Sequence, residues 1–485
     1  MLMNKLTLKS TVAPALLLPL MASIGACANP PSKSPEHPNI LVIITDQQNA
    51  SMMSCAGNRW LKTPALDGIA AQGVRFTNAY ATNPVCIPSR FSLQTGHYPS
   101  EINLMDNNTK PVNKEKVISM YPKSLGNLFR NAGYQTYYGG KVHLPVTNWK
   151  IGDWGYDVLT YNERDSLAAV CADFLLHRKK NDKPFLLISS FINPHDICLD
   201  AIKWATPESD LAKNSPKEVK EVDEALKLPE GVSKEEFFAK YCPPLPANHA
   251  PMIGETSGVD SLLKLRSFRG IVRDKWSDED WRMHRWAYAR LTERVDAQIG
   301  IVMEALKKSG LAENTIVIFT SDHGDLDAAH KLEHKTFFYQ ESINIPFLVS
   351  YPWMKQKGIV DSTHLVNNGL DLLPTLCDFA GIKAPSDITG KSVVPLTNQA
   401  EGINWRKHIF LETEIGFLIH TGRYKYELDG IGRNREMFVD LKSDPGETIN
   451  TINEPKYKKE ADKLRELLLN NLNEKGIHIK PIEMK

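Results

Sequence analysis

The chain has 485 residues, too many for one small hydrophobic core, so we expect a large domain with a smaller one. Hydrophobic residues make up 42% and charged residues 24% of the sequence, as is ordinary for a globular protein. The net charge is +1 without a long run of one sign, which argues against a nucleic-acid-binding protein. A site for an anion must therefore gather its positive charge locally.

The amino terminus is typical of a secretory signal. Basic residues precede an apolar run over 12–24 that is too short to span a membrane, and small residues follow it. Two processing routes are open: cleavage after Ala28, or lipidation of Cys27 within a segment that resembles a bacterial lipoprotein box. The second is favoured, and it predicts an exported lipoprotein, periplasmic or at the cell surface, whose membrane contact is a lipid anchor. We assign 1–28 to the signal and 29–37 to a tether.

Apolar runs rich in β-branched residues are typical of strands buried on both faces of a sheet. Such runs cover 38–45, 185–191, 315–320 and 345–350, and a further strand is expected over 134–138. Helical stretches lie between them at 121–132, 166–178 and 280–309. Strands that alternate with helices predict a parallel, doubly wound α/β sheet.

Two regions depart from this alternation. The segment 198–276 is rich in Lys, Glu and Pro and is interpreted as an insertion on the scaffold. After residue 400, short strand-like pieces precede a charged amphipathic helix, which predicts a small antiparallel sheet covered by one helix. The pieces lie at 409–411, 416–420, 424–428 and 437–441, and the helix at 458–473. The predicted domains are a catalytic domain over 38–400 and a C-terminal subdomain over 401–485.

Polar residues follow four of the predicted strands. Ligands of open α/β sheets bind beyond the carboxyl ends of the strands, so these residues are expected to converge on one site. Each has a plainer alternative, because an Asp after a strand is often a turn or cap and a lone His is often structural. Their recurrence favours a site. The four endings are Asp46-Gln47, 139–143, 193–196 and 321–325.

The segment 86–96 combines a cysteine with a helix start. Pro88 suits the first position of a helix, which places Cys86 just before a helix amino terminus. Backbone N–H groups and the helix dipole favour an anion there, and Arg90 adds a positive charge one turn on. From the residues alone, an activated cysteine beside an oxyanion site and a buried thiol in a loop remain equally open.

A zinc site is a weaker alternative. The segment 330–334 spells H-x-x-E-H, which on a helix would give two zinc ligands and a Glu base. No third ligand is marked, so zinc is disfavoured. The seven cysteines show no CxxC pair, which favours buried free thiols over a metal site.

The cysteine segment resembles the signature of the sulfatase family, whose cysteine is converted to formylglycine. Further blocks follow in the family's order, and the likeness spans about 38–450, weakest over 198–276. The chain departs from the pattern at Gln94, where the family usually has Leu. The matching residues are Pro38-Asn39-Ile40, Asp46, Cys86-x-Pro88-Ser89-Arg90, Thr95-Gly96, Gly140-Lys141-x-His143, Asn193-Pro194-His195, Thr320-Ser321-Asp322-His323-Gly324 and Lys335.

The resemblance implies the fold of the alkaline phosphatase superfamily, with a mostly parallel sheet between helices and a small antiparallel sheet with a helix. It also implies hydrolysis of sulfate esters by S–O cleavage through the hydrate of formylglycine at position 86. A divalent ion, calcium by preference, is implied as well. Gln47 replaces an Asp of the family and His323 stands where many members have Asn, which leaves magnesium and manganese open. The implied ligands are Asp46, Gln47, Asp322, His323 and modified Cys86.

By the same resemblance, Arg90, Lys141 and Lys335 stabilise the hydrate and the sulfuryl oxygens. His195, with Lys335, protonates the leaving alcohol, and His143 accepts the proton of the second hydroxyl so that sulfate leaves. Export and the long insertion suit sulfated polysaccharide fragments of glycosaminoglycan or algal type. The implied partners are such a carbohydrate and a formylglycine-generating or sulfatase-maturating enzyme.

Two other functions remain open. A phosphonate monoester or phosphodiester hydrolase of the same superfamily also uses a formylglycine. A glycan-binding lipoprotein with unmodified Cys86 would hold sulfate without turnover, although it would have no need for His143.

Overall fold

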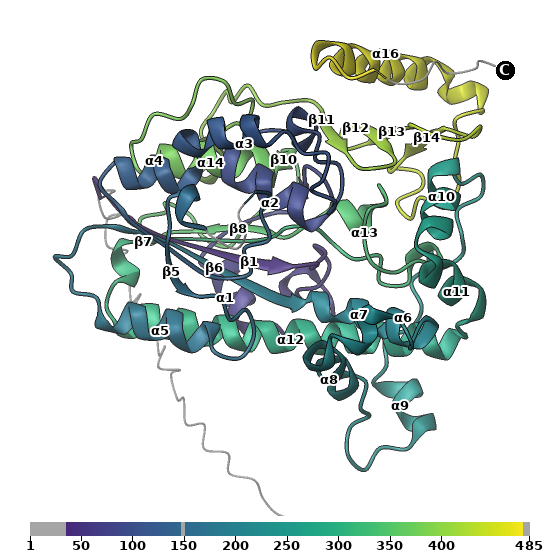
Figure 1. Ribbon diagram of the computed structural model, residues 1–485, viewed down its shortest axis with the longest axis horizontal. Helices are drawn as coiled ribbons and strands as arrows, with labels where there is room; N and C mark the ends of the chain where they lie inside the picture. Colours follow the sequence, from purple (N-terminus) through teal and green to yellow (C-terminus); the bar gives the residue numbers. More distant parts are fainter. Residues whose placement is uncertain (1–34, 147–150, 479–485) are drawn as a thin grey trace, which may run out of the picture.

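The protein is described here by a computed structural model that covers residues 35–146 and 151–478. The predicted signal, Cys27 and most of the tether lie outside these described residues. Figure 1 shows a large α/β domain, with a small antiparallel sheet and the helix α16 at its upper right. Within the described ranges, no helix is both long enough and apolar enough to cross a membrane.

The large domain is built on an eight-stranded sheet in the order β5-β4-β6-β1-β7-β8-β2-β9. Its strands are β1 (Asn39–Asp46), β2 (Gly73–Phe76), β4 (Gln135–Gly140), β5 (Asp157–Thr160), β6 (Phe185–Pro194), β7 (Thr315–Ser321), β8 (Phe347–Ser350) and β9 (Ile359–Asp361). All five strands predicted from the apolar runs are present, and β1, β4, β5, β6 and β7 run parallel. This confirms the predicted α/β class.

The sheet is mostly parallel, as expected, and the exception is β8, which pairs antiparallel with both β7 and β2. A parallel connection needs a crossover, usually a helix that returns the chain to the other end of the sheet. The segment between β7 and β8 contains only the short helices η7 (Ala329–Lys331) and α13 (Gln340–Ile343). The chain therefore enters β8 from the same edge at which it leaves β7.

Helices cover both faces of the sheet (Figure 1). Side chains of alternate β1 residues lie on opposite faces of the sheet. Ile40, Val42 and Ile44 pack into one hydrophobic cluster, and Leu41 and Ile43 pack into the other. The helices of the first cluster are α2 (Cys86–Thr95), α3 (Lys114–Met120), α4 (Leu125–Asn131) and α14 (Asn368–Phe379). Those of the second are α1 (Pro64–Ala71), α5 (Leu167–His177) and α12 (Asp278–Lys308).

The segment predicted as an insertion is helical. It packs a hydrophobic cluster against α12 through residues of α6 and α8. Its helices are α6 (Cys198–Ala205), α7 (Asp210–Lys213), α8 (Pro216–Ala225), α9 (Lys234–Lys240), α10 (Ser257–Leu265) and α11 (Ser267–Lys275). This segment is thus fixed beside the sheet edge at which the parallel strands end.

The small antiparallel sheet and its helix are confirmed close to their predicted bounds. The four strands pair in sequence order, and α16 covers one face through Leu464 and Leu468. The elements are β11 (Ile409–Glu412), β12 (Gly416–His420), β13 (Tyr424–Asp429), β14 (Glu436–Asp440) and α16 (Lys458–Glu474). Further short elements include β3 (Ala79–Tyr80), its parallel partner β10 (Val366–Asn367) and α15 (Val394–Thr397).

Candidate functional site

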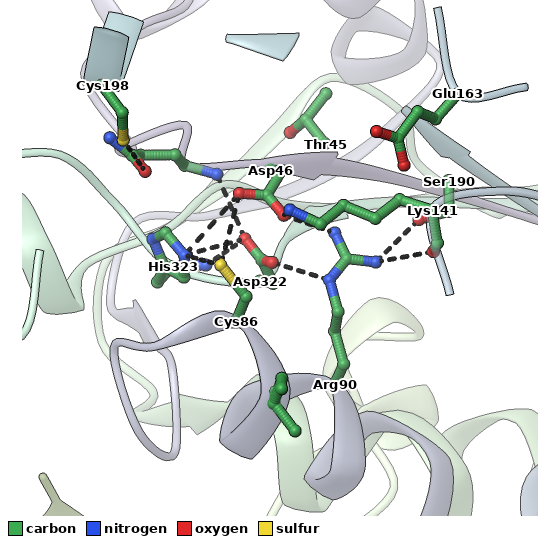
Figure 2. Close-up of polar contacts among 12 residues, drawn as sticks. Thr45, Asp46, Cys86, Arg90, Lys141, Glu163, Ser190, Cys198, Asp322 and His323 are labelled. Carbon is green, nitrogen blue, oxygen red and sulfur yellow. Dashed lines mark hydrogen bonds and ion pairs between the residues drawn. The ribbon is translucent and has the colours of Figure 1, made fainter. Parts of the chain in front are cut away.

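The carboxyl ends of the central parallel strands bring polar side chains to one point, as predicted from the four strand endings. Asp46 is the last residue of β1, Lys141 directly follows β4, and Asp322 directly follows β7. Helix α2 adds Cys86 and Arg90 from the side (Figure 2). His195 follows β6, and Lys335 enters from the loop between β7 and β8.

Helix α2 begins at Cys86, which corrects the expectation that it begins at Pro88. Val85 is the residue before the helix, and its carbonyl accepts the Ser89 amide at 2.9 Å, so the first turn already includes the cysteine. The early amides of a helix have no partner inside it, so Pro88 fits at the third position without losing a hydrogen bond. Cys86 is therefore held rigidly, and its side chain is fully buried.

Arg90 joins the two strand-end carboxylates. Its Nη2 lies 2.9 Å from Asp46 Oδ2 and its Nε 2.8 Å from Asp322 Oδ2, while Nη1 donates to Ser190 Oγ at 2.8 Å (Figure 2). Lys141 Nζ lies 2.7 Å from the same Asp46 oxygen. All four charged groups are buried, so their mutual positions are fixed by ion pairs in a region of low polarity.

Basic side chains also surround the cysteine. Cys86 Sγ lies 3.0 Å from Lys335 Nζ and 3.1 Å from His323 Nε2. Burial on its own raises the pKa of the thiol, but the positive charges of Lys335 and Lys141 outweigh it and lower that pKa well below its usual value. The site therefore favours negative charge at residue 86.

The two carboxylates differ in their electrostatic surroundings. Burial on its own raises the pKa of Asp46, but the adjacent Lys141 and Arg90 hold it well below its ordinary value. Burial and the negative charge of Asp46 raise the pKa of Asp322 to about 6. A divalent cation between the carboxylates would relieve this repulsion.

One group of side chains among the described residues is arranged to hold a metal ion. Ligand atoms of Asp46, Cys86, Asp322 and His323 all lie within 4.8 Å of one another. His323 Nδ1 lies 2.9 Å from the Gly324 carbonyl oxygen, which places the ring proton on Nδ1, so that Nε2, which faces Cys86 Sγ, offers a lone pair to a cation. Two carboxylates and one imidazole nitrogen fit a divalent ion.

Gln47, the remaining predicted ion ligand, lies beside this group but is engaged elsewhere. Its Oε1 accepts from Lys335 Nζ at 2.9 Å and from the Cys198 thiol at 3.1 Å. Its Nε2 donates to Asp325 Oδ2 at 2.6 Å. Both polar atoms of this amide are therefore used outside the four-residue group.

The two predicted proton-transfer histidines both interact with the Cys86 side chain, and this interaction on its own raises the pKa of each ring. In the described part of the chain, Nδ1 of His143 and Nδ1 of His195 are buried without a hydrogen-bond partner. Burial, with the charges of Lys141 and Lys335, lowers the pKa of His195 to about 4. Burial likewise lowers the pKa of His143. The neutral rings can exchange protons with a ligand at residue 86.

The H-x-x-E-H segment does not form a zinc site. Its first histidine lies in η7 with a φ of 57°, and His334 has a φ of 63°, so the two do not share a helix face. His330 instead stacks on Tyr339 with ring centroids 3.8 Å apart. The six cysteines in the described ranges are all unpaired.

Ser190 and Asp325 belong to the site but were not singled out from the sequence. Ser190 lies inside an apolar strand run, and nothing in that run marks the serine that contacts Arg90. Asp325 is the last residue of the 321–325 strand ending, and this position in the sequence could have indicated that it lies at the site.

Comparisons with known proteins agree with this geometry. The family model described as Sulfatase matches residues 38–382, and one described as N-sulphoglucosamine sulphohydrolase, C-terminal, matches 328–475. A Delta 4,5-hexuronate-2-O-sulfatase of Bacteroides thetaiotaomicron is 30% identical, with 92% of this chain and 90% of that protein covered. An ulvan-active sulfatase of Formosa agariphila is 27% identical, with 92% and 83% covered.

A solved structure extends the likeness to three dimensions. It is described as a complex with its substrate, D-glucosamine-2-N,6-O-disulfate, and it matches with a TM-score of 0.66 at 25% identity. The match covers 93% of this chain and 100% of that chain.

Proposed function

Because the chain belongs to the sulfatase family, it is a hydrolase of sulfuric esters, and we propose that its substrates are sulfated carbohydrates. The support comes from similar proteins, whose names include a hexuronate sulfatase, an ulvan-active sulfatase and a glucosamine disulfate complex. The experiment is a screen of defined sulfated glycosaminoglycan and algal oligosaccharides for free sulfate. Release from aryl sulfates but from none of the sugars would contradict the proposal.

We propose that Cys86 acts after oxidation to formylglycine by a maturating enzyme. The observation that carries this is the convergence of Lys335, His323 and Asp46 on the Cys86 sulfur. The aldehyde hydrate has two hydroxyls, so one can displace the alcohol from sulfur. When the second hydroxyl loses its proton, its oxygen forms the aldehyde again and the sulfate leaves. A cysteine or serine has no second hydroxyl for that step.

The basic side chains have separate tasks. Lys335 contacts residue 86 and Lys141 pairs with the adjacent Asp46, and both stabilise the negative charge of the sulfate group during transfer. Arg90 holds the two carboxylates in place while its charge contributes to the same field. The net charge of the chain is only +1, so an anion site needs a local group of positive side chains, and these three provide it.

Asp46, Asp322, His323 and residue 86 would hold the divalent ion, and their arrangement fits it. When bound, the ion supplies a fixed positive charge to residue 86 and to the sulfate group. We propose calcium, because the carboxylates provide hard oxygen ligands, although the histidine nitrogen also suits manganese.

Chelation tests the ion directly. Exhaustive chelation is expected to reduce sulfate release about 100-fold or more, because the transferring group loses its largest local charge. The measurement is activity after dialysis and after separate return of calcium, magnesium or manganese, alongside elemental analysis of the protein. Full activity in a preparation free of metal would contradict the assignment.

His195 is proposed to protonate the leaving alcohol. Its pKa of about 4 reflects burial beside two cations, and the negative charge of a bound sulfate ester would raise that pKa toward a useful value. His195→Ala is expected to lower kcat about 100-fold for a sugar sulfate, whose alkoxide is a poor leaving group. For 4-nitrophenyl sulfate, whose phenolate leaves without a proton, the loss should be below tenfold.

The contrast between these two substrates is the readout, and His143→Ala is the matched control. That variant lacks the acceptor of the second step, so it should slow both substrates by a similar factor. Equal losses for both substrates with His195→Ala would contradict the role of His195 as the proton donor.

The alternative functions can be tested with the same purified protein. Paired kinetics on a sulfate monoester and a phosphodiester distinguish a sulfatase from a phosphonate monoester or phosphodiester hydrolase. A peptide that carries unmodified Cys86 in protein from its native host would favour the glycan-binding lipoprotein.

Export as a lipoprotein through Cys27 is proposed from the sequence of the leader. Fatty-acid labelling that persists in Cys27→Ala would contradict this anchor.

A further inference from the structure

His195 lies on a short turn between β6 and α6. The turn is η5 (His195–Ile197), a single turn of 3-10 helix. The backbone hydrogen bonds of such a turn have poorer geometry than those of an α-helix, so contacts from other elements must fix its position. A proton donor displaced by about 1 Å can cost about 100-fold in rate. The contacts that hold η5 therefore bear on the reaction.

Arg164 binds the residue that follows His195 through two parallel hydrogen bonds. Its Nε donates to Asp196 Oδ2 at 3.1 Å, and its Nη2 donates to Asp196 Oδ1 at 2.6 Å. This bidentate geometry fixes both the distance and the orientation of the carboxylate. Asp196 is fully buried, and both of its side-chain oxygens accept from the arginine. The pair thus orients the turn that carries His195.

Arg164 is in turn held by other elements. Its backbone carbonyl accepts from Gln298 Nε2 of α12 at 2.7 Å. Its Nη2 lies 3.1 Å from Glu218 Oε1 of α8, and its Nη1 lies 3.2 Å from Glu163 Oε1. The guanidinium therefore connects the turn to a helix of the α/β scaffold and to a helix of the segment predicted as an insertion.

We propose that Arg164 is a positioning residue that holds His195 at the leaving oxygen by fixing Asp196, the next residue in the chain. The inference rests on the proposed function, in which His195 protonates the leaving alcohol. Carboxylates engage all three nitrogens of the Arg164 guanidinium, so its effect on the reaction passes through His195. Its removal should accordingly harm only substrates whose leaving group needs a proton.

Arg164→Ala tests this selectivity. The turn would lose its bidentate contact, and His195 would be displaced while the residues that bind sulfate stay in place. We expect kcat for a sugar sulfate to fall about 10–100-fold. For 4-nitrophenyl sulfate, whose phenolate leaves without a proton, the loss should be below about threefold. A loss by the same factor for both substrates would overturn the inference, because it would indicate a general structural defect.

The double variant with His195→Ala shows whether Arg164 acts through the histidine. Residues that act through one group do not give additive effects. In a chain without the His195 ring, Arg164→Ala should therefore cost less than about threefold more on the sugar sulfate. Multiplication of the two single losses would refute the inference. Equal losses for both substrates with His195→Ala alone would refute it as well, since His195 would then not be the proton donor.

Arg406→Ala is the matched control. Arg406 forms the same kind of bidentate pair with Asp371, at 2.5 and 2.6 Å, and it joins the segment before β11 to α14. In both pairs the arginine side chain is 13% exposed and the aspartate side chain is 0% exposed. This variant should lower the melting temperature but change kcat by the same factor for both substrates. If it gave the contrast expected of Arg164→Ala, that contrast would not report on His195.

Arg164→Lys covers the case in which Arg164→Ala does not fold. A lysine keeps the positive charge, but its single ammonium cannot hold both Asp196 oxygens in one orientation. We expect a loss of about three- to tenfold on the sugar sulfate and none on 4-nitrophenyl sulfate. The wild-type protein, converted at residue 86, is the reference. If it releases no sulfate from any ester, the proposed function fails; if it is active and Arg164→Lys matches it on both substrates, only the positioning role fails.

Discussion

Cys86→Ala and Cys86→Ser are both expected to lose sulfate release by about 10,000-fold or more, because each removes the residue on which both steps of the proposed reaction depend. The serine variant is the more informative of the two. Its hydroxyl can accept the sulfate group, but no second hydroxyl is present to expel it. We therefore expect Cys86→Ser to accumulate a sulfated peptide at position 86, which mass spectrometry after incubation with substrate detects.

Cys171→Ser is the matched control. Cys171 is also fully buried, yet it lies in α5 within the hydrophobic cluster on the α12 face of the sheet. This variant should keep wild-type turnover per folded chain. Near-normal hydrolysis by Cys86→Ala would show that residue 86 is not the reacting group.

Arg90→Ala is expected to abolish activity and also to destabilise the protein. Removal of the guanidinium leaves Asp46 and Asp322 buried without their shared partner. Loss of one member of a buried ion pair costs about 3–5 kcal/mol of unfolding free energy. The loss of electrostatic preorganisation should lower kcat about 1,000-fold. Denaturant titration and sulfate release, both with the activating divalent ion at saturation, measure the two effects.

Arg90→Lys separates charge from geometry. A lysine keeps the positive charge, but its single ammonium cannot reproduce the fork that reaches Asp46, Asp322 and Ser190 together. We expect part of the stability to return while activity stays low. If Arg90→Lys restored full activity, the fork geometry would have no role in the site.

The strands that support the site could be predicted because burial on both faces leaves a clear pattern. Every residue of β1 is buried, and the run is apolar from Ile40 to Ile44, between Asn39 at its start and the polar residues at its carboxyl end. The same reasoning located β6 and β7, and with them the edge at which Asp46, His195 and Asp322 gather. The hydrophobic pattern of the strands and the polar residues at their ends therefore predicted both the fold class and the position of the site.

Other features depend on contacts between distant segments, which leave no local pattern. The direction of β8 follows from the path of the loop before it, and that loop also carries Lys335 to a cysteine 249 residues earlier in the chain. The start of α2 at Cys86 depends on the Val85 carbonyl, whereas Pro88 taken alone indicated a later start. The hydrogen bonds of the Gln47 side chain depend on Lys335 and Asp325, which lie far from it in the sequence.

The most direct test compares turnover with the chemical state of residue 86. Samples with graded conversion can be prepared by varying the co-expressed maturating enzyme. Mass spectrometry then gives the fraction of chains in which sulfur and two hydrogens are replaced by one oxygen. We predict that sulfate release per chain rises in proportion to that fraction and falls to zero for the unconverted protein. Release that does not depend on the converted fraction would contradict the account.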